Sequence, residues 1–311
     1  MHAFFRFLVA LAPLAVSPLA GHAAESSVPV TARDAPQTAV PADKRTHILT
    51  IAACPTRPRI GTRSTEACAR FLPQMSAALA QRLGAEPADV HQLLNAQATG
   101  PAVLAAIRRV GRGLGPNDRL VIYMLSHGGG IARAQGKEEM FMLWTESQPA
   151  FIQLGIAQGV YVPAADLAAA VHATHAGEVV VMLDGCEAGL ADEDFISRHP
   201  AKKVERAEAV VMSSGGTQFA KMDTDFSPVF GARLLIALQR AQPTLADAVA
   251  DASAATSRDT PDICRAMLER YPPANAAPVE PSMCAQDPAR DDPTRLLTRI
   301  PLRPVQRAAS N

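Results

Sequence analysis

The chain has 311 residues, enough for one domain of about 200–250 residues with tails, or for two small domains. Apolar residues make up 48% and charged residues 19%, proportions typical of a packed α/β core. Thirty basic residues balance thirty acidic ones, so no excess of charge indicates nucleic acid or a membrane surface as a partner.

Residues 1–23 have the pattern of a secretory signal. Arg6 supplies a positive charge, residues 8–20 are mostly apolar, and small residues precede a cleavage point after residue 23. Residues 24–45 contain prolines among small residues and predict a flexible lead-in. No later segment approaches the roughly 18 apolar residues of a membrane span. We therefore expect a secreted or periplasmic protein without membrane contact after signal removal.

The first predicted elements come after this lead-in. Residues 47–53 form an apolar run that predicts a strand. Residues 66–83 carry apolar side chains at helical spacing, and Gly84 follows as a left-handed cap. Residues 100–110 predict a second helix.

The next strand ends at a histidine. Residues 120–126 are an apolar run, followed by His127 and three glycines from Gly128 to Gly130. Glycines leave backbone N–H groups accessible and let a substrate carbonyl approach closely. Residues 131–139 predict a polar loop, and residues 141–144 predict a short edge strand.

A helix that begins at Pro163 leads to a strand that ends at a cysteine. Residues 179–184 contain neither Gly nor Pro, which is typical of a strand buried on both faces of a parallel sheet. Cys186 follows at the carboxyl end, where open α/β sheets bind ligands. His127 precedes Cys186 by 59 residues, enough for one crossover between parallel strands. We expect the imidazole and the thiol at the same edge of the sheet.

The rest of the chain predicts a further strand over residues 207–213 and helices over 226–242 and 244–257. Prolines accumulate beyond Tyr271, so residues 258–311 are interpreted as an extended or disordered tail, apart from any disulfide between Cys264 and Cys284. The principal domain is therefore predicted to span residues 46–257.

The cysteines predict two local disulfides. Cys54 and Cys68 lie 14 residues apart, and Cys264 and Cys284 lie 20 apart. In an oxidising compartment each pair would stabilise the fold by about 3 kcal/mol. Reduced thiols or another connectivity are the alternatives. The local pairing leaves Cys186 as the free thiol of an exported protein.

The two motifs together resemble those of the caspase-like cysteine peptidases, which include caspases, metacaspases, legumains and gingipains. His-Gly follows one strand, and Asp-Gly-Cys-Glu-Ala-Gly follows the next, within a match over residues 46–242. The resemblance implies a three-layer α/β sandwich with a mostly parallel central sheet flanked by helices. It also implies a polypeptide substrate and no cofactor or metal; a calcium requirement and the oligomeric state are left open.

In such a peptidase each motif has a chemical role. Cys186 would attack the scissile carbonyl, and His127 would protonate the leaving amine. The backbone N–H groups of Gly128 and Cys186 would hold the oxyanion.

Substrate specificity is predicted from two acids. In the resembling families the residue two before the cysteine lines the S1 pocket, which is Asp184 here, and Asp225 resembles a second pocket acid. Two acids favour Arg or Lys at P1 through charge-assisted hydrogen bonds, whereas an arginine from residues 57–63 would favour Asn. Asp225 is equally well interpreted as the N-cap of a helix that starts near Phe226.

Other functions remain open at this stage. The same domain without turnover would be a binding module, and an amine in place of water would make it a transpeptidase or ligase. An esterase is disfavoured because no G-x-S-x-G nucleophile elbow occurs. The charged stretch from Asp192 to Glu208, with Arg198 and Arg206, predicts either a solvated loop and helix or a processing linker.

Overall fold

The computed structural model describes the chain from Lys44 onward with gaps. The ranges are 44–54, 62–133, 136–145, 152–192, 194–195, 206–271 and 280–305. The predicted signal, most of the lead-in, the arginines between residues 55 and 61, and Arg198 lie outside them. None of the helices in these ranges combines the length and the apolar character of a bilayer-spanning segment.

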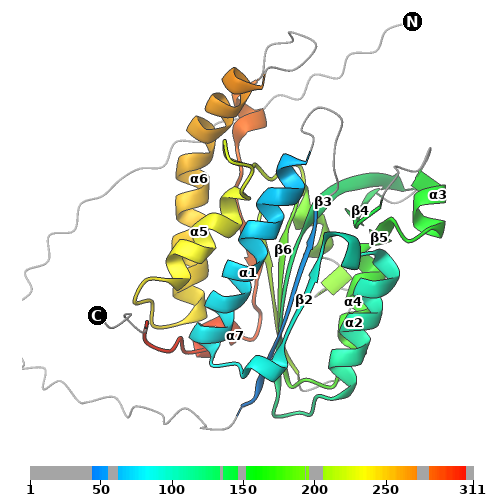
Figure 1. The fold of residues 1–311 in the computed structure, drawn as a ribbon, viewed down its shortest axis with the longest axis vertical. Helices are drawn as coiled ribbons and strands as arrows, with labels where there is room; N and C mark the ends of the chain where they lie inside the picture. Colours follow the sequence, from blue (N-terminus) through cyan, green and yellow to red (C-terminus); the bar gives the residue numbers. More distant parts are fainter. Residues whose placement is uncertain are drawn as a thin grey trace, which may run out of the picture. The chain divides into compact units, whose positions relative to one another are not determined.

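A mostly parallel sheet forms the centre of the described residues (Figure 1). Its strand order is β2-β1-β3-β6-β7-β8, and β4 and β5 extend it beside β3. The first five strands of that order run parallel, and β8 is antiparallel to β7. The strands are β1 Thr46–Ala53, β2 Val90–Leu94, β3 Arg119–Arg133, β4 Gly136–Met142, β5 Tyr161–Pro163, β6 Glu178–Asp184, β7 Ala207–Met212 and β8 Ala289–Asp291.

Helices cover both faces of the sheet, which confirms the predicted three-layer α/β architecture. In Figure 1, α1, α5 and α6 lie on one side, and α2 and α4 on the other. The helices are α1 Arg63–Leu83, α2 Gly100–Arg112, α3 Ile152–Ala157, α4 Ala164–His172, α5 Val229–Leu238, α6 Leu245–Arg270 and α7 Leu296–Arg299.

The alternation of side chains along the strands divides the core into two layers. On β6, Val180 and Met182 pack toward α1 and α5, whereas Val181 and Leu183 pack toward α2 and α4. All seven residues of β6 are buried, as expected for a central parallel strand without Gly or Pro. Helix α1 ends where Gly84 adopts a left-handed φ of 69°, as its sequence predicts.

The segment after His127 is a strand, which corrects the predicted polar loop. β3 continues through the three glycines to Arg133 and pairs antiparallel with β4, so that His127 lies opposite Met142. The predicted edge strand at 141–144 is the end of β4, whose outer partner is β5. Backbone pairing, rather than side-chain propensity, makes this hairpin, because glycine is depleted in strands.

The predicted extended tail is also wrong. Helix α6 continues to Arg270, across the predicted domain boundary at residue 257. The Cys264–Cys284 disulfide then links this helix to the segment that precedes β8. There β8 extends the sheet along β7, and Leu296 and Leu297 of α7 are fully buried in the layer that contains α1, α5 and α6. The C-terminal segment is therefore part of the domain core.

Candidate active site

The register of β3 and β6 brings both motifs to one edge of the sheet. The two strands are parallel neighbours, paired from Arg119 opposite Glu178 to Leu125 opposite Asp184. His127 and Cys186 each follow this last pair by two residues, on strands that lie about 4.8 Å apart. They therefore share the carboxyl edge of the sheet.

Gly128 packs closely against the cysteine motif. A Cβ atom at this position would lie 2.5 Å from the Oε1 atom of Glu139 and closer still to the carbonyl oxygen of Cys186. Only a residue without a side chain allows β3 to approach Cys186 this closely. The predicted oxyanion donor therefore packs directly on the residue that carries the thiol.

Cys186 has the free thiol among the described cysteines. Cys54–Cys68 and Cys264–Cys284 are disulfides, which confirms the predicted local pairing. The half-buried thiol lies 3.8 Å from the carbonyl oxygen of Ala220. Burial raises the pKa of Cys186, and the positive charge of Lys221 opposes this shift. Lys221 was not predicted from the sequence, because it reaches the thiol from the segment after β7.

Contacts from two other strands hold the turn that contains Cys186. Just before the thiol, the Gly185 N–H donates to Ser213 Oγ at 3.1 Å, at the end of β7. Just after it, Glu187 has a left-handed φ of 53°, and its N–H donates to the carbonyl oxygen of Gln218 at 2.7 Å. The Glu187 carboxylate in turn accepts the N–H of Gly130 on β3 at 2.5 Å. The cysteine turn is thus tied to both of its neighbouring segments.

Asp184, the first predicted pocket acid, is buried. Its side chain accepts a hydrogen bond from the Tyr123 hydroxyl at 2.7 Å, and the residue is 2% exposed. Gly231 of α5 covers it so closely that a Cβ there would lie 2.8 Å from Oδ2. Burial raises the pKa of Asp184 to about 6, against the lowering effect of the Tyr123 and Ser213 donors. β6 ends at Asp184, so strand alternation does not extend to Cys186, and the pocket role stays a prediction.

Asp225, the second predicted pocket acid, lies on an exposed turn. Its Oδ1 accepts the Ser227 N–H at 2.9 Å, and Asp223 accepts the N–H groups of both residues. Burial and the neighbouring Asp225 raise the pKa of Asp223. Helix α5 begins only at Val229, with Pro228 at its N-cap, so the interpretation of Asp225 as that N-cap is wrong. Its role in substrate binding stays a prediction.

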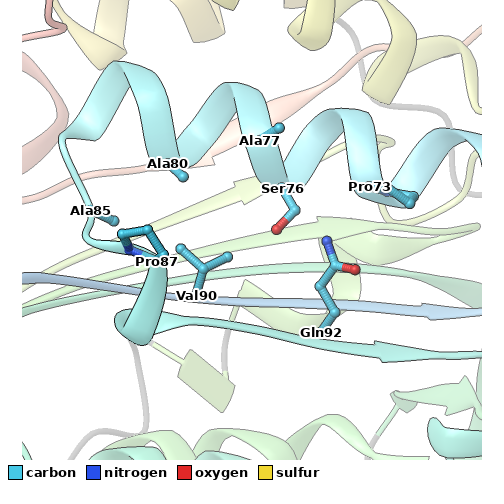
Figure 2. A pocket seen from close by; sticks show the side chains of 8 residues that line it. All are labelled: Pro73, Ser76, Ala77, Ala80, Ala85, Pro87, Val90 and Gln92. Carbon is cyan, nitrogen blue, oxygen red and sulfur yellow. The ribbon is translucent and has the colours of Figure 1, made fainter.

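A groove among the described residues lies away from this site. It has a volume of about 510 Å³ and separates α1 from the edge strand β2 (Figure 2). Ser76 on α1 and Gln92 on β2 point toward one another across it. Its lining residues are Pro73, Ser76, Ala77, Ala80, Ala85, Pro87, Val90 and Gln92. None of them follows β3 or β6, so this groove is not the site that the two motifs predict.

In the described part of the chain, no group of three or more His, Cys, Asp or Glu side chains is placed to hold a metal ion.

Comparison with known proteins gives structural likenesses, of which two are described here. No protein-family model matches the chain, and no curated protein does. Protein GSU0716 from Geobacter sulfurreducens is 16% identical, with a TM-score of 0.49 over 81% of this chain and 97% of that chain. Caspase-1 from Spodoptera frugiperda is 15% identical, with a TM-score of 0.45 over 84% of this chain and 94% of that chain. Both scores are below 0.5, so neither likeness assigns a family or an activity.

Proposed function

We propose that the chain is an exported cysteine endopeptidase of the caspase-like type. The observation that carries the proposal is the pairing of β3 with β6 in parallel, with His127 and Cys186 each two residues past the last pair. The contact between Gly128 and Cys186 supports the same assignment, because it brings the predicted oxyanion donor against the nucleophile. Cys186 is also the cysteine that the two disulfides leave free.

In the proposed reaction the thiolate of Cys186 attacks the scissile carbonyl and forms a tetrahedral intermediate. The backbone N–H groups of Gly128 and Cys186 stabilise its oxyanion. His127 gives a proton to the leaving amine, and water then resolves the acyl-enzyme. Lys221 assists formation of the thiolate, since its charge lowers the pKa of Cys186 against the effect of burial.

The proposed P1 preference is Arg or Lys, with Asn as the alternative. A charged Asp184 beneath the site would attract a basic side chain through charge-assisted hydrogen bonds. In the free protein this carboxylate is covered by Tyr123 and Gly231, so substrate binding has to open a path to it. Asp225 is already exposed on its turn.

Two observations favour a second candidate function, a binding module without turnover. Burial raises the pKa of the Cys186 thiol, which lowers the fraction of reactive thiolate at neutral pH. The predicted pocket acid Asp184 is 2% exposed. Both features are expected of a domain that keeps the fold and the two motifs but no longer cleaves peptides.

Export is proposed from the signal pattern and the disulfides. Two disulfides in one domain are typical of secreted or periplasmic proteins, because the cytosol keeps thiols reduced. An N-terminal sequence of the purified mature protein tests it. Export predicts a start near residue 24, and an intact Met1 in the periplasmic or secreted fraction would contradict the signal.

The activity is tested with fluorogenic peptides that carry Arg, Lys or Asn at P1. We expect hydrolysis that Cys186→Ala abolishes and that His127→Ala lowers by about 10²–10⁴-fold, the usual contribution of a positioned acid–base group. His91→Ala, at an exposed position on edge strand β2, is the matched control and should keep full activity. A folded protein that cleaves no peptide supports the binding module, and activity that survives Cys186→Ala rules out this nucleophile.

A further inference from the structure

A buried glutamate lies beneath the glycine segment that follows His127. Glu139 is on β4, opposite Gly130 of β3, and is 0% exposed. Its Oε1 accepts the N–H of Gly129 at 2.9 Å. Its other oxygen, Oε2, is buried without a hydrogen-bond partner among the described residues. Buried carboxyl oxygens are nearly always hydrogen-bonded, so this atom calls for an explanation.

Glu139 contacts the parts of the chain that the proposed chemistry uses. Oε1 lies 2.5 Å from the point where Gly128 would carry a Cβ, so the carboxyl packs directly against that residue. Because the same point is in contact with the carbonyl oxygen of Cys186, the carboxyl, β3 and the cysteine turn form one packed unit. Glu139 also interacts electrostatically with the Cys186 thiol.

The carboxyl is uncharged at neutral pH. Burial raises the pKa of Glu139 to about 9; the Gly129 N–H opposes this rise, and the nearby Glu187 contributes to it. The other charged groups that act on Glu139 or on the Cys186 thiol are Glu187 after Cys186, Asp184 at the end of β6, and Lys221 after β7. An ionised Glu139 raises the pKa of the Cys186 thiol, whereas Lys221 lowers it. Glu139 and Lys221 therefore act on the thiol with opposite effects.

We propose that Glu139 is a positioning residue of the thiol site: its uncharged carboxyl braces Gly128 and Gly129 against Cys186, and its ionisation opposes formation of the thiolate. The inference rests on the proposed function only in taking Cys186 as the reactive group. A neutral acid keeps one proton to donate, so Oε2 can carry the proton while Oε1 accepts from Gly129. The bracing and the electrostatic effect both come from this one side chain.

Alkylation of Cys186 by iodoacetamide tests the inference without any turnover. The rate of carbamoylmethylation follows the thiolate fraction, and the other four cysteines are in disulfides. We would measure it by peptide mass from pH 6 to pH 10.5 for the parent protein, Glu139→Gln and Glu138→Gln. Glutamine keeps the acceptor for the Gly129 N–H but stays uncharged. Glu138, the preceding residue on β4, points to the other face of the strand and is the matched control.

The inference predicts equal rates near pH 7 and faster alkylation of Glu139→Gln above pH 9. The gain should reach up to about tenfold, because removing the negative charge raises the thiolate fraction. Glu138→Gln should follow the parent protein throughout. Superimposable profiles for the parent and Glu139→Gln would overturn the inference, as would a Glu139→Gln rate that differs already at pH 7.

The outcome is separable from that of the peptidase proposal. A protein that cleaves no peptide but shows the Glu139-dependent profile refutes the activity and supports this inference. An active peptidase with unchanged alkylation refutes this inference alone. Glu139→Ala adds a second readout, because loss of the brace should lower kcat on a peptide substrate by about 10-fold or more with little change in KM. An unchanged kcat in Glu139→Ala would contradict the bracing role.

Discussion

Replacing Gly128 with alanine adds one methyl group where β3 meets Cys186. The new carbon would lie 2.5 Å from Glu139 Oε1 and closer to the Cys186 carbonyl oxygen, whereas ordinary contact begins at 3.4 Å. The strand must therefore move by about 1 Å or displace the cysteine turn. Such overpacking lowers the free energy of unfolding by about 1–3 kcal/mol. A displacement of about 1 Å at reacting groups lowers kcat by about 10²-fold.

Gly129→Ala is the matched control for this substitution. At Gly129 the nearest atom to an added Cβ is Glu187 Oε2 at 3.8 Å, so the methyl group fits without movement. We would measure the free energy of unfolding in urea and the hydrolysis of a fluorogenic peptide for both variants. Gly128→Ala should be destabilised and nearly inactive, and Gly129→Ala should retain most of both properties. Equal behaviour of the two variants would refute the close approach of β3 to Cys186.

Two further predictions concern the buried acid and the C-terminal segment. Tyr123→Phe removes a donor to Asp184, whose carboxyl is charged above pH 6, so the loss in free energy of unfolding should be about 2 kcal/mol at pH 8 and about 1 kcal/mol at pH 5. Urea unfolding at both pH values measures this loss, and Tyr161→Phe at a half-buried position is the control. A loss for Tyr123→Phe that does not depend on pH would contradict the prediction. Leu297→Ala in α7 should lower the free energy of unfolding by about 2–5 kcal/mol, and Met283→Ala at a 49% exposed position by under 1 kcal/mol. Equal small losses would mean that the C-terminal segment does not belong to the core.

The raised pKa of Asp184 has a defined effect on stability. In the unfolded chain this carboxyl ionises near pH 4, whereas in the native protein it keeps its proton until about pH 6. The native state therefore binds more protons in this interval, and its stability falls as the pH rises through it. Above pH 6 both states are ionised and the contribution of this residue stays constant.

The central layer of the fold was predictable because long segments carry unambiguous patterns. The run before Asp184 contains neither Gly nor Pro, and it became the fully buried β6. Gly84 ends α1 in the left-handed conformation that its position indicates. In both cases the signal is local: a period of apolar residues or a single backbone conformation decides the structure without help from distant residues.

The β3–β4 hairpin and the C-terminal segment were not predictable, because contacts with distant residues determine their structure. Three consecutive glycines after His127 have no strand propensity, and only the ladder with β4 makes them extended. β8 and α7 are three and four residues long, too short for any periodic pattern. Their stability comes from pairing with β7 and from burial of Leu296 and Leu297, contacts that exist only in the folded domain.

In the candidate site, too, features set by local patterns were predictable and features that depend on distant segments were not. The order of the two motifs was enough to predict that His127 and Cys186 follow neighbouring strands, because parallel strands end at a common edge. The partners of the thiol were not predictable. Glu139 becomes buried only because its strand β4 pairs with β3, and Asp184 becomes inaccessible only because Gly231 of α5 covers it. Burial of an acid depends on distant segments that no local pattern reveals.

Covalent labelling shows whether His127 and Cys186 act together on a peptide carbonyl. A peptidyl acyloxymethyl ketone with Arg at P1, and a second with Asn, would be incubated with the parent protein and with His127→Ala, and the adduct located by peptide mass. We expect one adduct per chain, on Cys186, formed at least about 10²-fold more slowly in His127→Ala. A label on another residue, no label from either compound on folded protein, or equal rates in the two proteins would contradict it.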